Sequence, residues 1–286
     1  MEMMPALSIS LLGGFAVLRD GEPVTAFGYD KVRALLAFLA VEADRPHRRD
    51  RLAAIYWPEQ PRALALQSLS QALYQLRRAL GDRNERAAAS PCLLVTPQTV
   101  QFNQACDFSL DTLALQAEAA ACAGHPHPYL HTCTTCLARL HAAALLYRGS
   151  FLDGFSLPGS PDFDEWSLVQ REHFRSLVLD LLHTLWAAHD RRHEHEQALA
   201  CARRRLAIDP WLEEAHREAM QSLAAAGGRA AALAQFETCR RVLAGELGLE
   251  PSAATLALYR RLSAGSDAAA AGQAPGHAAG RLLPVP

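Results

Sequence analysis

The sequence predicts a mainly α-helical protein, in which an N-terminal winged helix-turn-helix with small β elements precedes an all-α, tetratricopeptide-like repeat region. Three observations support this fold class. Two amphipathic helices joined by a proline-rich turn lie between His47 and Leu80, short β-type segments flank them, and residues after Asp107 show helical periodicity without a convincing strand. A chain of 286 residues is long enough for about two domains.

The helix pair is the most informative segment of the chain. The first helix is predicted over Arg48–Tyr56, and Pro58 and Pro61 follow it, because proline lacks the amide hydrogen that a helix interior requires. The second helix is predicted over Arg62–Leu80, with Gly81 as its stop. Leucines recur along it every three or four residues, so one face should be buried. These leucines are Leu66, Leu69, Leu73, Leu76 and Leu80.

The opposite face of the second helix carries amides, a phenol and a guanidinium, but no carboxylate. At about 100° per residue, its members are Gln67, Gln71, Tyr74, Gln75 and Arg78. In a major groove, which admits a helix, glutamine pairs with adenine and arginine with guanine. We therefore expect this face to read bases; the alternative is a solvated helix face. The further residues predicted to bind DNA are Arg48, Arg49, Arg62 and Ser68.

Short β signals surround the helix pair. Strands are predicted over Leu7–Leu12 and Phe15–Leu18, with Asp20-Gly21 as a hairpin turn and a further strand starting at Val24. A helix is expected over Lys31–Ala43. A terminal hairpin is expected from Leu93–Val95 and Val100–Phe102. Strands, three helices and a hairpin, in this order, predict a winged helix of the response-regulator (OmpR) type.

The rest of the chain is expected to be helical. The runs with helical periodicity are 109–122, 134–147, 162–189, 194–208, 211–226, 229–246 and 252–262. Ala198-Leu199 recurs as Ala232-Leu233 about 34 residues later, which is the tetratricopeptide period. Stacked helical hairpins are therefore the predicted packing.

A metal site is suggested between the first two of these runs. His125-Pro126-His127 precedes Cys133-Thr134-Thr135-Cys136. A Cys-x-x-Cys motif with two nearby histidines supplies the four ligands of a tetrahedral zinc ion. Four protein ligands leave no open position, so we expect a structural zinc; the alternative is packing cysteines beside a polar loop.

Charge and composition limit the possible classes of protein and its location in the cell. Basic residues outnumber acidic ones up to residue 104 and the reverse holds afterwards, within a net charge of −2. The chain has no signal-peptide pattern and no apolar run near the ~18 residues of a membrane span. We expect a cytoplasmic protein without membrane contact, whose seven scattered cysteines stay reduced. No nucleophile–base or acid pair stands out, so we expect no enzyme activity.

Several motifs resemble one bacterial family. In the N-terminal part they are Lys31–Ala40, Arg51–Ala53, Tyr56–Pro58, Leu69–Leu73 and Leu76–Gly81. In the helical part they are Tyr147–Phe155, Phe163–Trp166, Asp209–Arg217 and Gly245–Pro251. The first group resembles the DNA-binding region of the SARP/AfsR-type transcriptional activators, and the second resembles their bacterial transcriptional activation domain.

The resemblance implies a domain plan and a function. Residues 1–104 would form the OmpR-type DNA-binding domain, 105–262 the activation domain, and 263–286, rich in Ala, Gly and Pro, a disordered tail or linker. The protein would be a sequence-specific DNA-binding activator, with double-stranded DNA and RNA polymerase as partners and a second copy on DNA. The alternatives are a helical-repeat interaction scaffold, or the regulatory front part of a longer ATPase-type regulator, because Leu283–Pro286 resembles the linker before such a domain.

Overall fold

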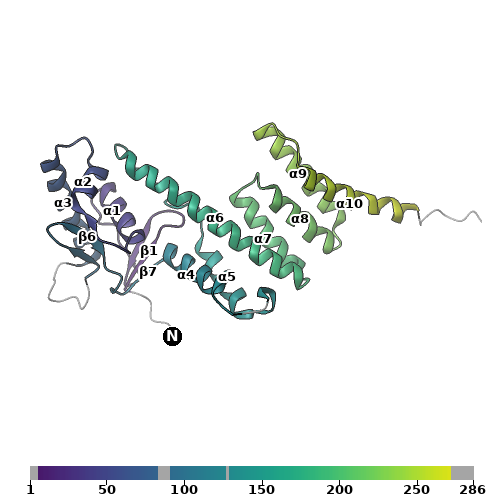
Figure 1. Ribbon diagram of the computed structural model, residues 1–286, viewed down its shortest axis with the longest axis horizontal. Coiled ribbons are helices and arrows are strands. Elements are labelled where there is room, and N and C mark those ends of the chain that lie inside the picture. The colour runs from purple at the N-terminus through teal and green to yellow at the C-terminus, as the bar shows by residue number, and fades with distance from the viewer. Residues whose placement is uncertain (1–5, 83–90, 127–128, 272–286) are drawn as a thin grey trace, which may run out of the picture. The chain divides into compact units, whose positions relative to one another are not determined.

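The structure is a computed structural model that describes residues 6–82, 91–126 and 129–271 (Figure 1). The chain divides into two compact units, residues 1–181 and 182–286. The predicted fold class is confirmed: the protein is mainly helical, with small β-sheets confined to the N-terminal unit. Among the described helices, none is both long enough and apolar enough to cross a lipid bilayer.

A four-stranded sheet opens the first unit. Its strands are β1 (Leu7–Ser10), β2 (Ala16–Arg19), β3 (Glu22–Pro23) and β7 (Phe108–Leu110), in the order β3-β2-β1-β7. The strands β1, β2 and β3 are antiparallel, whereas β7 runs parallel to β1. Asp20 and Gly21 join β2 to β3 and both have positive φ, of 50° and 85°, as a tight hairpin turn requires.

Three helices and a second sheet complete the winged helix. The helices are α1 (Asp30–Val41), α2 (Arg49–Tyr56) and α3 (Arg62–Leu80). The strands are β4 (His47–Arg48), β5 (Leu93–Val95) and β6 (Thr99–Phe102), in the order β4-β6-β5. Apolar side chains of α1 and α3 face each other, and Tyr56 at the end of α2 is buried with its hydroxyl donating to the carbonyl oxygen of Ala34 at 3.1 Å.

The helical part of the first unit packs on this winged helix. It contains α4 (Asp111–Ala123), the short 3-10 helix η1 (Leu130–Thr132), α5 (Thr134–Leu146) and the first part of α6 (Pro161–Arg191). The helices α4 and α5 form a hairpin. Trp166 on α6 contacts the ring of Phe38 on α1, with centroids 5.0 Å apart, and its Nε1 donates to Glu42 Oε1 at 3.0 Å.

The carboxylate of Asp111 connects α4 to the backbone that follows β1. Asp111, the first residue of α4, is buried, and its carboxylate accepts backbone N–H bonds from Leu11 and Leu12 at 2.9 Å. Arg148 pairs with the same carboxylate at 3.0 Å. The first turn of α4 is therefore fixed to the backbone that follows β1, and an unpaired N–H at either position would be costly to bury.

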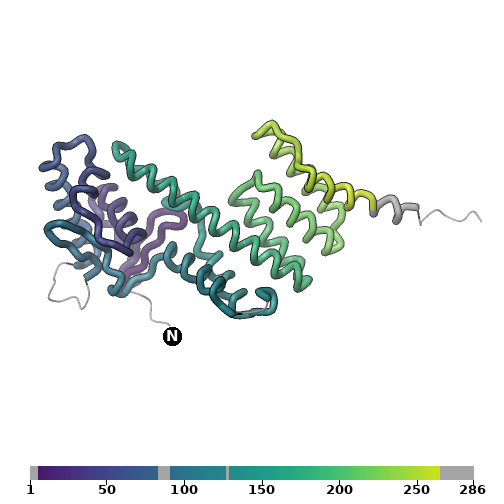
Figure 2. Tube along the Cα trace, in the orientation of Figure 1, coloured from purple at the N-terminus to yellow at the C-terminus, as the bar shows by residue number. Residues whose placement is uncertain are grey.

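The second unit consists of stacked helical hairpins. After the end of α6 come α7 (His195–Ile208), α8 (Glu213–Ala225), α9 (Arg229–Leu247) and α10 (Ala253–Ala271), each packed on the next (Figure 2). Small side chains allow the helices to approach closely: Ala198, Ala202, Ala215, Ala219 and Ala232 are all fully buried. Phe236 on α9 stacks on Tyr259 of α10 at a centroid distance of 4.1 Å. This packing confirms the predicted repeat-like arrangement.

Several elements differ from the sequence-based expectations; for example, the helix expected over Lys31–Ala43 is Asp30–Val41. β7 lies in the part expected to have no strand, and it was not predictable because three residues show no alternation pattern. A two-residue strand, β4, replaces the predicted first residue of α2. The third strand ends at Pro23 and does not start at Val24. Finally, α10 continues through Ala271 into the predicted tail, because alanine is the strongest helix former; residues 272–286 lie outside the described residues.

Candidate nucleic-acid interface

The turn between α2 and α3 sets the position of the candidate DNA-reading helix. α2 ends at Tyr56, and α3 begins after Pro61, whose ring cannot continue a helix from the preceding residue. α3 ends at Leu80, and the capping residue that follows, Gly81, adopts φ 76° and donates its N–H to carbonyl oxygens of the last turn. The bounds of α3 are those predicted from the sequence.

The two faces of α3 separate as the leucine periodicity predicts. Of the predicted apolar stripe, Leu69, Leu73, Leu76 and Leu80 are buried. On the opposite side Gln67, Gln71, Tyr74 and Arg78 are exposed, and 60% of Tyr74 is accessible. The exposed face therefore carries donors and acceptors in a row, with an aromatic ring among them and no carboxylate.

Gln75 of this face and Ser68, another of the residues predicted to bind DNA, are partly withdrawn from solvent. Gln75 is half-buried against the backbone of Gly28, where a Cβ would lie 2.4 Å from Gln75 Oε1. This Oε1 atom is buried and has no hydrogen-bond partner among the described residues. Ser68 donates its hydroxyl to Gln60 Oε1 in the turn at 2.9 Å. Both residues are thus better placed to hold α3 in position than to reach outward.

The arginines at the start of α2 have different surroundings. Arg48 is exposed and lies in β4, directly before the helix. Arg49 is half-buried, and its guanidinium donates to the hydroxyl of Ser70 on α3 at 2.7 Å. Ser70 in turn donates to the carbonyl oxygen of Leu66 at 2.7 Å. Arg49 therefore braces α2 against α3, while Arg48 remains open to an anion beside the helix N-terminus.

Arg62, at the first position of α3, has an acidic neighbour. Its guanidinium lies 2.8 Å from the carboxylate of Asp50 on α2, and the two side chains are 77% and 42% exposed. An exposed pair of this kind contributes little to stability. A phosphate could therefore replace Asp50 at small cost, but the carboxylate lowers the local positive charge.

The turn of the hairpin β5–β6 lies beside the start of α2. Its turn, Thr96–Thr99, is closed by the Thr96 hydroxyl, which accepts the N–H of Thr99 at 2.9 Å. The carbonyl oxygen of Gln98 accepts the N–H of Arg49 at 2.9 Å, and Gln98 is exposed. The wing tip thus lies beside the arginines of α2. The sequence predicts the hairpin, but no local signal in it predicts this contact.

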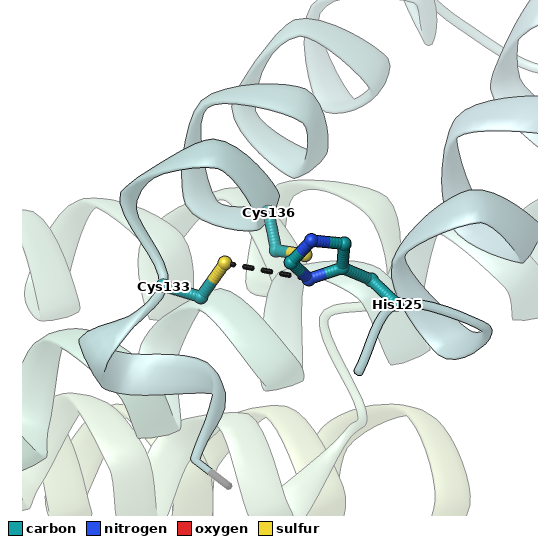
Figure 3. A group of neighbouring side chains, drawn as sticks. All are labelled: His125, Cys133 and Cys136. Atoms are coloured by element: carbon teal, nitrogen blue, oxygen red, sulfur yellow. Dashed lines mark hydrogen bonds between the residues drawn. The ribbon is translucent and has the colours of Figure 1, made fainter. Parts of the chain in front are cut away.

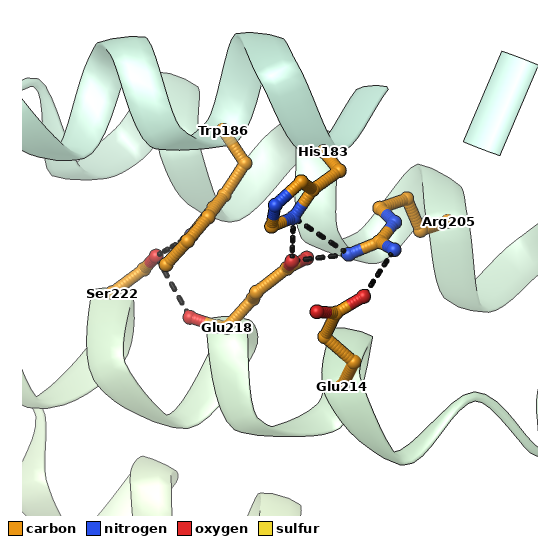
Figure 4. A network of polar contacts seen from close by, with 6 residues as sticks. All are labelled: His183, Trp186, Arg205, Glu214, Glu218 and Ser222. Atoms are coloured by element: carbon orange, nitrogen blue, oxygen red, sulfur yellow. Dashed lines mark hydrogen bonds and ion pairs between the residues drawn. The ribbon is translucent and has the colours of Figure 1, made fainter. Parts of the chain in front are cut away.

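The structure also brings three of the four predicted metal ligands together. The ligand atoms of His125, Cys133 and Cys136 all lie within 4.8 Å of one another. His127 lies outside the described residues. A second group of metal-type side chains, His183, Glu214 and Glu218, already surrounds the guanidinium of Arg205, which supplies a positive charge at that place (Figure 4).

Comparisons with known proteins agree on one type of protein. Residues 112–263 match the family model of the bacterial transcriptional activator domain. The regulatory protein AfsR of Streptomyces coelicolor is 29% identical over 260 residues, which are 90% of this chain but only 24% of AfsR. The transcriptional regulatory protein MoaR1 of Mycobacterium tuberculosis is 26% identical, over 90% of this chain and 79% of MoaR1.

One solved structure has a similar fold. Mycobacterium tuberculosis EmbR, in complex with a low affinity phosphopeptide, matches with a TM-score of 0.68 at 22% sequence identity. The match covers 94% of this chain and 70% of that chain. At this level of identity the likeness establishes the shared fold.

Proposed function

The chain belongs to the bacterial transcriptional activator domain family, and we propose that it activates transcription by binding specific sequences of double-stranded DNA and recruiting RNA polymerase. The relatives it matches are named as regulatory proteins, and MoaR1 is named as a transcriptional one. The exposed face of α3 carries the proposal for DNA. Its side chains Gln67, Gln71 and Arg78 are of the types that pair with adenine and guanine edges, and an α-helix fits a major groove.

The surroundings of α3 support contacts with DNA phosphates beside the reading helix. Arg48 is exposed at the start of α2, and the wing tip lies next to it. Contacts of this type fix the register of a protein on the duplex, whereas base contacts supply the specificity. We therefore expect Arg48 to affect the affinity for all sequences and Gln71 to affect the preference for particular bases.

The helical remainder supports the proposal for a protein partner. Stacked helical hairpins present extended surfaces to other proteins, and acidic residues outnumber basic ones in this part of the chain. Most of this helical part, residues 112–263, matches the bacterial transcriptional activator domain. We therefore assign the contact with RNA polymerase, and any contact with a second copy on DNA, to the helical part.

The decisive experiment is selection of bound sequences from random duplex DNA by the full chain, followed by affinity measurements over a range of salt concentrations. Enrichment of a defined sequence, with an affinity that decreases steeply with salt, is the expected result. Binding without any enriched sequence, or no binding to DNA at low salt, would reject the proposal in favour of a protein-interaction scaffold.

A transcription assay tests the second part of the proposal. The full chain should stimulate transcription from a promoter that carries the selected sequence. A fragment of residues 1–181, which retains the winged helix and β7, should bind this sequence and stimulate less. Equal stimulation by the fragment and the full chain would show that α7–α10 are not needed for activation.

A further inference from the structure

The connection between α4 and α5 brings together three side chains that favour a soft metal ion. His125 follows the end of α4, Cys133 directly precedes α5, and Cys136 lies in the first turn of α5 (Figure 3). Their ligand atoms are all within 4.8 Å of one another. The two thiols are three residues apart at a helix start, so they lie on one face, and the hairpin of α4 and α5 returns His125 to that face.

The spacing of these atoms fits a tetrahedral ion. The Cys133 Sγ and His125 Nδ1 atoms are 3.7 Å apart. A zinc ion with Zn–S of about 2.3 Å and Zn–N of about 2.0 Å in tetrahedral geometry holds a sulfur and a nitrogen roughly 3.5 Å apart. The sulfur and nitrogen of this pair therefore need to move only slightly to accept the ion.

The surroundings of the cluster provide a further sulfur ligand. Cys122, in the last turn of α4, is buried and its Sγ donates to the carbonyl oxygen of Cys136 at 3.6 Å. Structural zinc ions usually have four ligands, and this thiol is our candidate for the fourth. With it, the ligands would come from both helices of the hairpin and from the segment between them.

Ordinary packing does not account for the whole cluster. Cys136 is fully buried, as a packing thiol would be, and burial raises its pKa to about 12. However, Cys133 is only half-buried and His125 is exposed, so packing in a hydrophobic core does not explain why these two side chains lie together. In the group formed by His183, Glu214 and Glu218, by contrast, Arg205 already supplies the compensating charge.

We propose that His125, Cys133 and Cys136 bind a structural zinc ion that fixes the connection between α4 and α5. The ion would cross-link the segment after α4 to the start of α5. Because the site exists only in the folded hairpin, the free energy of binding adds to the free energy of folding.

The test uses the full chain without an affinity tag that contains histidines. The protein is stripped of metal with a chelator and then titrated with zinc, and the bound zinc is measured by atomic spectrometry together with the melting temperature. The variants are His125→Ala and Cys133→Ser, and Cys92→Ser is the matched control, because Cys92 is also a half-buried thiol of the first unit. Cobalt(II) replaces zinc in a parallel titration, since its absorption reports tetrahedral geometry and thiolate ligands.

The parent and Cys92→Ser should each bind about one equivalent of zinc and melt at a higher temperature with it. His125→Ala and Cys133→Ser should bind at least about 100-fold more weakly. The proposal is rejected if the parent binds no zinc, or if both variants bind it as the parent does. Should either variant fail to fold, the cobalt spectrum of the parent decides: thiolate-to-cobalt absorption with tetrahedral bands supports the site, and their absence overturns it.

Discussion

The guanidinium of Arg205 on α7 is paired with the carboxylate of Glu218 on α8, and the two side chains are only 4% and 3% exposed (Figure 4). Glu214, one turn before Glu218, pairs with the same guanidinium at 2.8 Å. His183 on α6 approaches Glu218 through its Nδ1 at 2.6 Å. A buried charge of this kind is tolerated only while its partner is present, since the low-dielectric interior penalises an isolated ion.

Replacing Arg205 with methionine should therefore lower the free energy of unfolding by about 3–5 kcal/mol, because Glu218 is left buried without its counter-charge. The double variant Arg205→Met with Glu218→Met should recover most of the loss. Arg240→Met, which breaks the exposed pair with Glu237, is the control and should change the free energy of unfolding far less, because solvent screens an exposed ion pair. Urea denaturation measures all three; a cost for Arg205→Met no larger than that of the control would contradict the prediction.

Gln71 lies on the exposed face of α3, and its replacement by alanine should relax the preference for one base by about 1–3 kcal/mol without unfolding the protein. Binding to the selected sequence and to its single-base variants measures the change. Gln197→Ala, which removes an exposed glutamine from α7, should leave every affinity unchanged. If Gln71→Ala keeps the base preferences of the parent, α3 does not present this face to the groove.

Arg48 should act on phosphate and not on bases. Arg48→Gln is expected to weaken all sequences together and to reduce the slope of log K against log salt by about 0.9, the contribution of one phosphate contact. Arg240→Gln causes the same change in net charge on α9 and should alter neither quantity. A change in base preference, or an unchanged salt slope, would show that Arg48 does not bind a phosphate.

His216 makes the stability of the helical repeats depend on pH. Its Nε2 donates to the carbonyl oxygen of Pro210 at 2.9 Å, since a carbonyl can only accept, and its Nδ1 accepts from Gln235 Nε2 at 2.8 Å. The ring is thus buried in its neutral form, and burial lowers the pKa of His216. Below about pH 6.5 the unfolded state binds a proton that the folded state does not.

The free energy of unfolding should therefore decrease as the pH falls from about 7 to about 5. The decrease can reach at most about 1.4 kcal/mol per pH unit for one group. In His216→Gln this decrease should be smaller than in the parent, whereas His193→Asn, at an exposed turn position with φ 58°, should retain it. Urea denaturation at several pH values tests the difference, and equal slopes for the parent and His216→Gln would assign the dependence to other groups.

Local signals made some elements fully predictable. The leucine periodicity, the two prolines before it and Gly81 after it are all contained in one segment, so the bounds of α3 follow from the sequence alone. The exposure of Gln67, Gln71 and Arg78 follows from the same periodicity. Their contact with DNA stays a prediction.

Other features depend on contacts between residues far apart in the sequence, and these could not be predicted. The parallel pairing of β7 with β1 joins segments that are far apart in the sequence, and nothing within either strand specifies its partner. Gln75 has the periodicity of the exposed face, but a loop residue, Gly28, covers it. Similarly, the serine hydroxyl that holds Arg49 is on another helix, and a sequence pattern cannot show that two helices exchange a hydrogen bond at that point.

The carboxylate of Asp111 has a consequence for exchanging parts between regulators of this family. A chimera joined after Phe102 would take β1 from one parent, and β7, Asp111 and Arg148 from the other. The new parent would have to supply a carboxylate at the same place, or two backbone amides after β1 would lose their acceptor. The winged helix therefore cannot be exchanged as a unit that ends at β6. A junction that keeps β7 and the first turn of α4 together with β1 preserves these contacts.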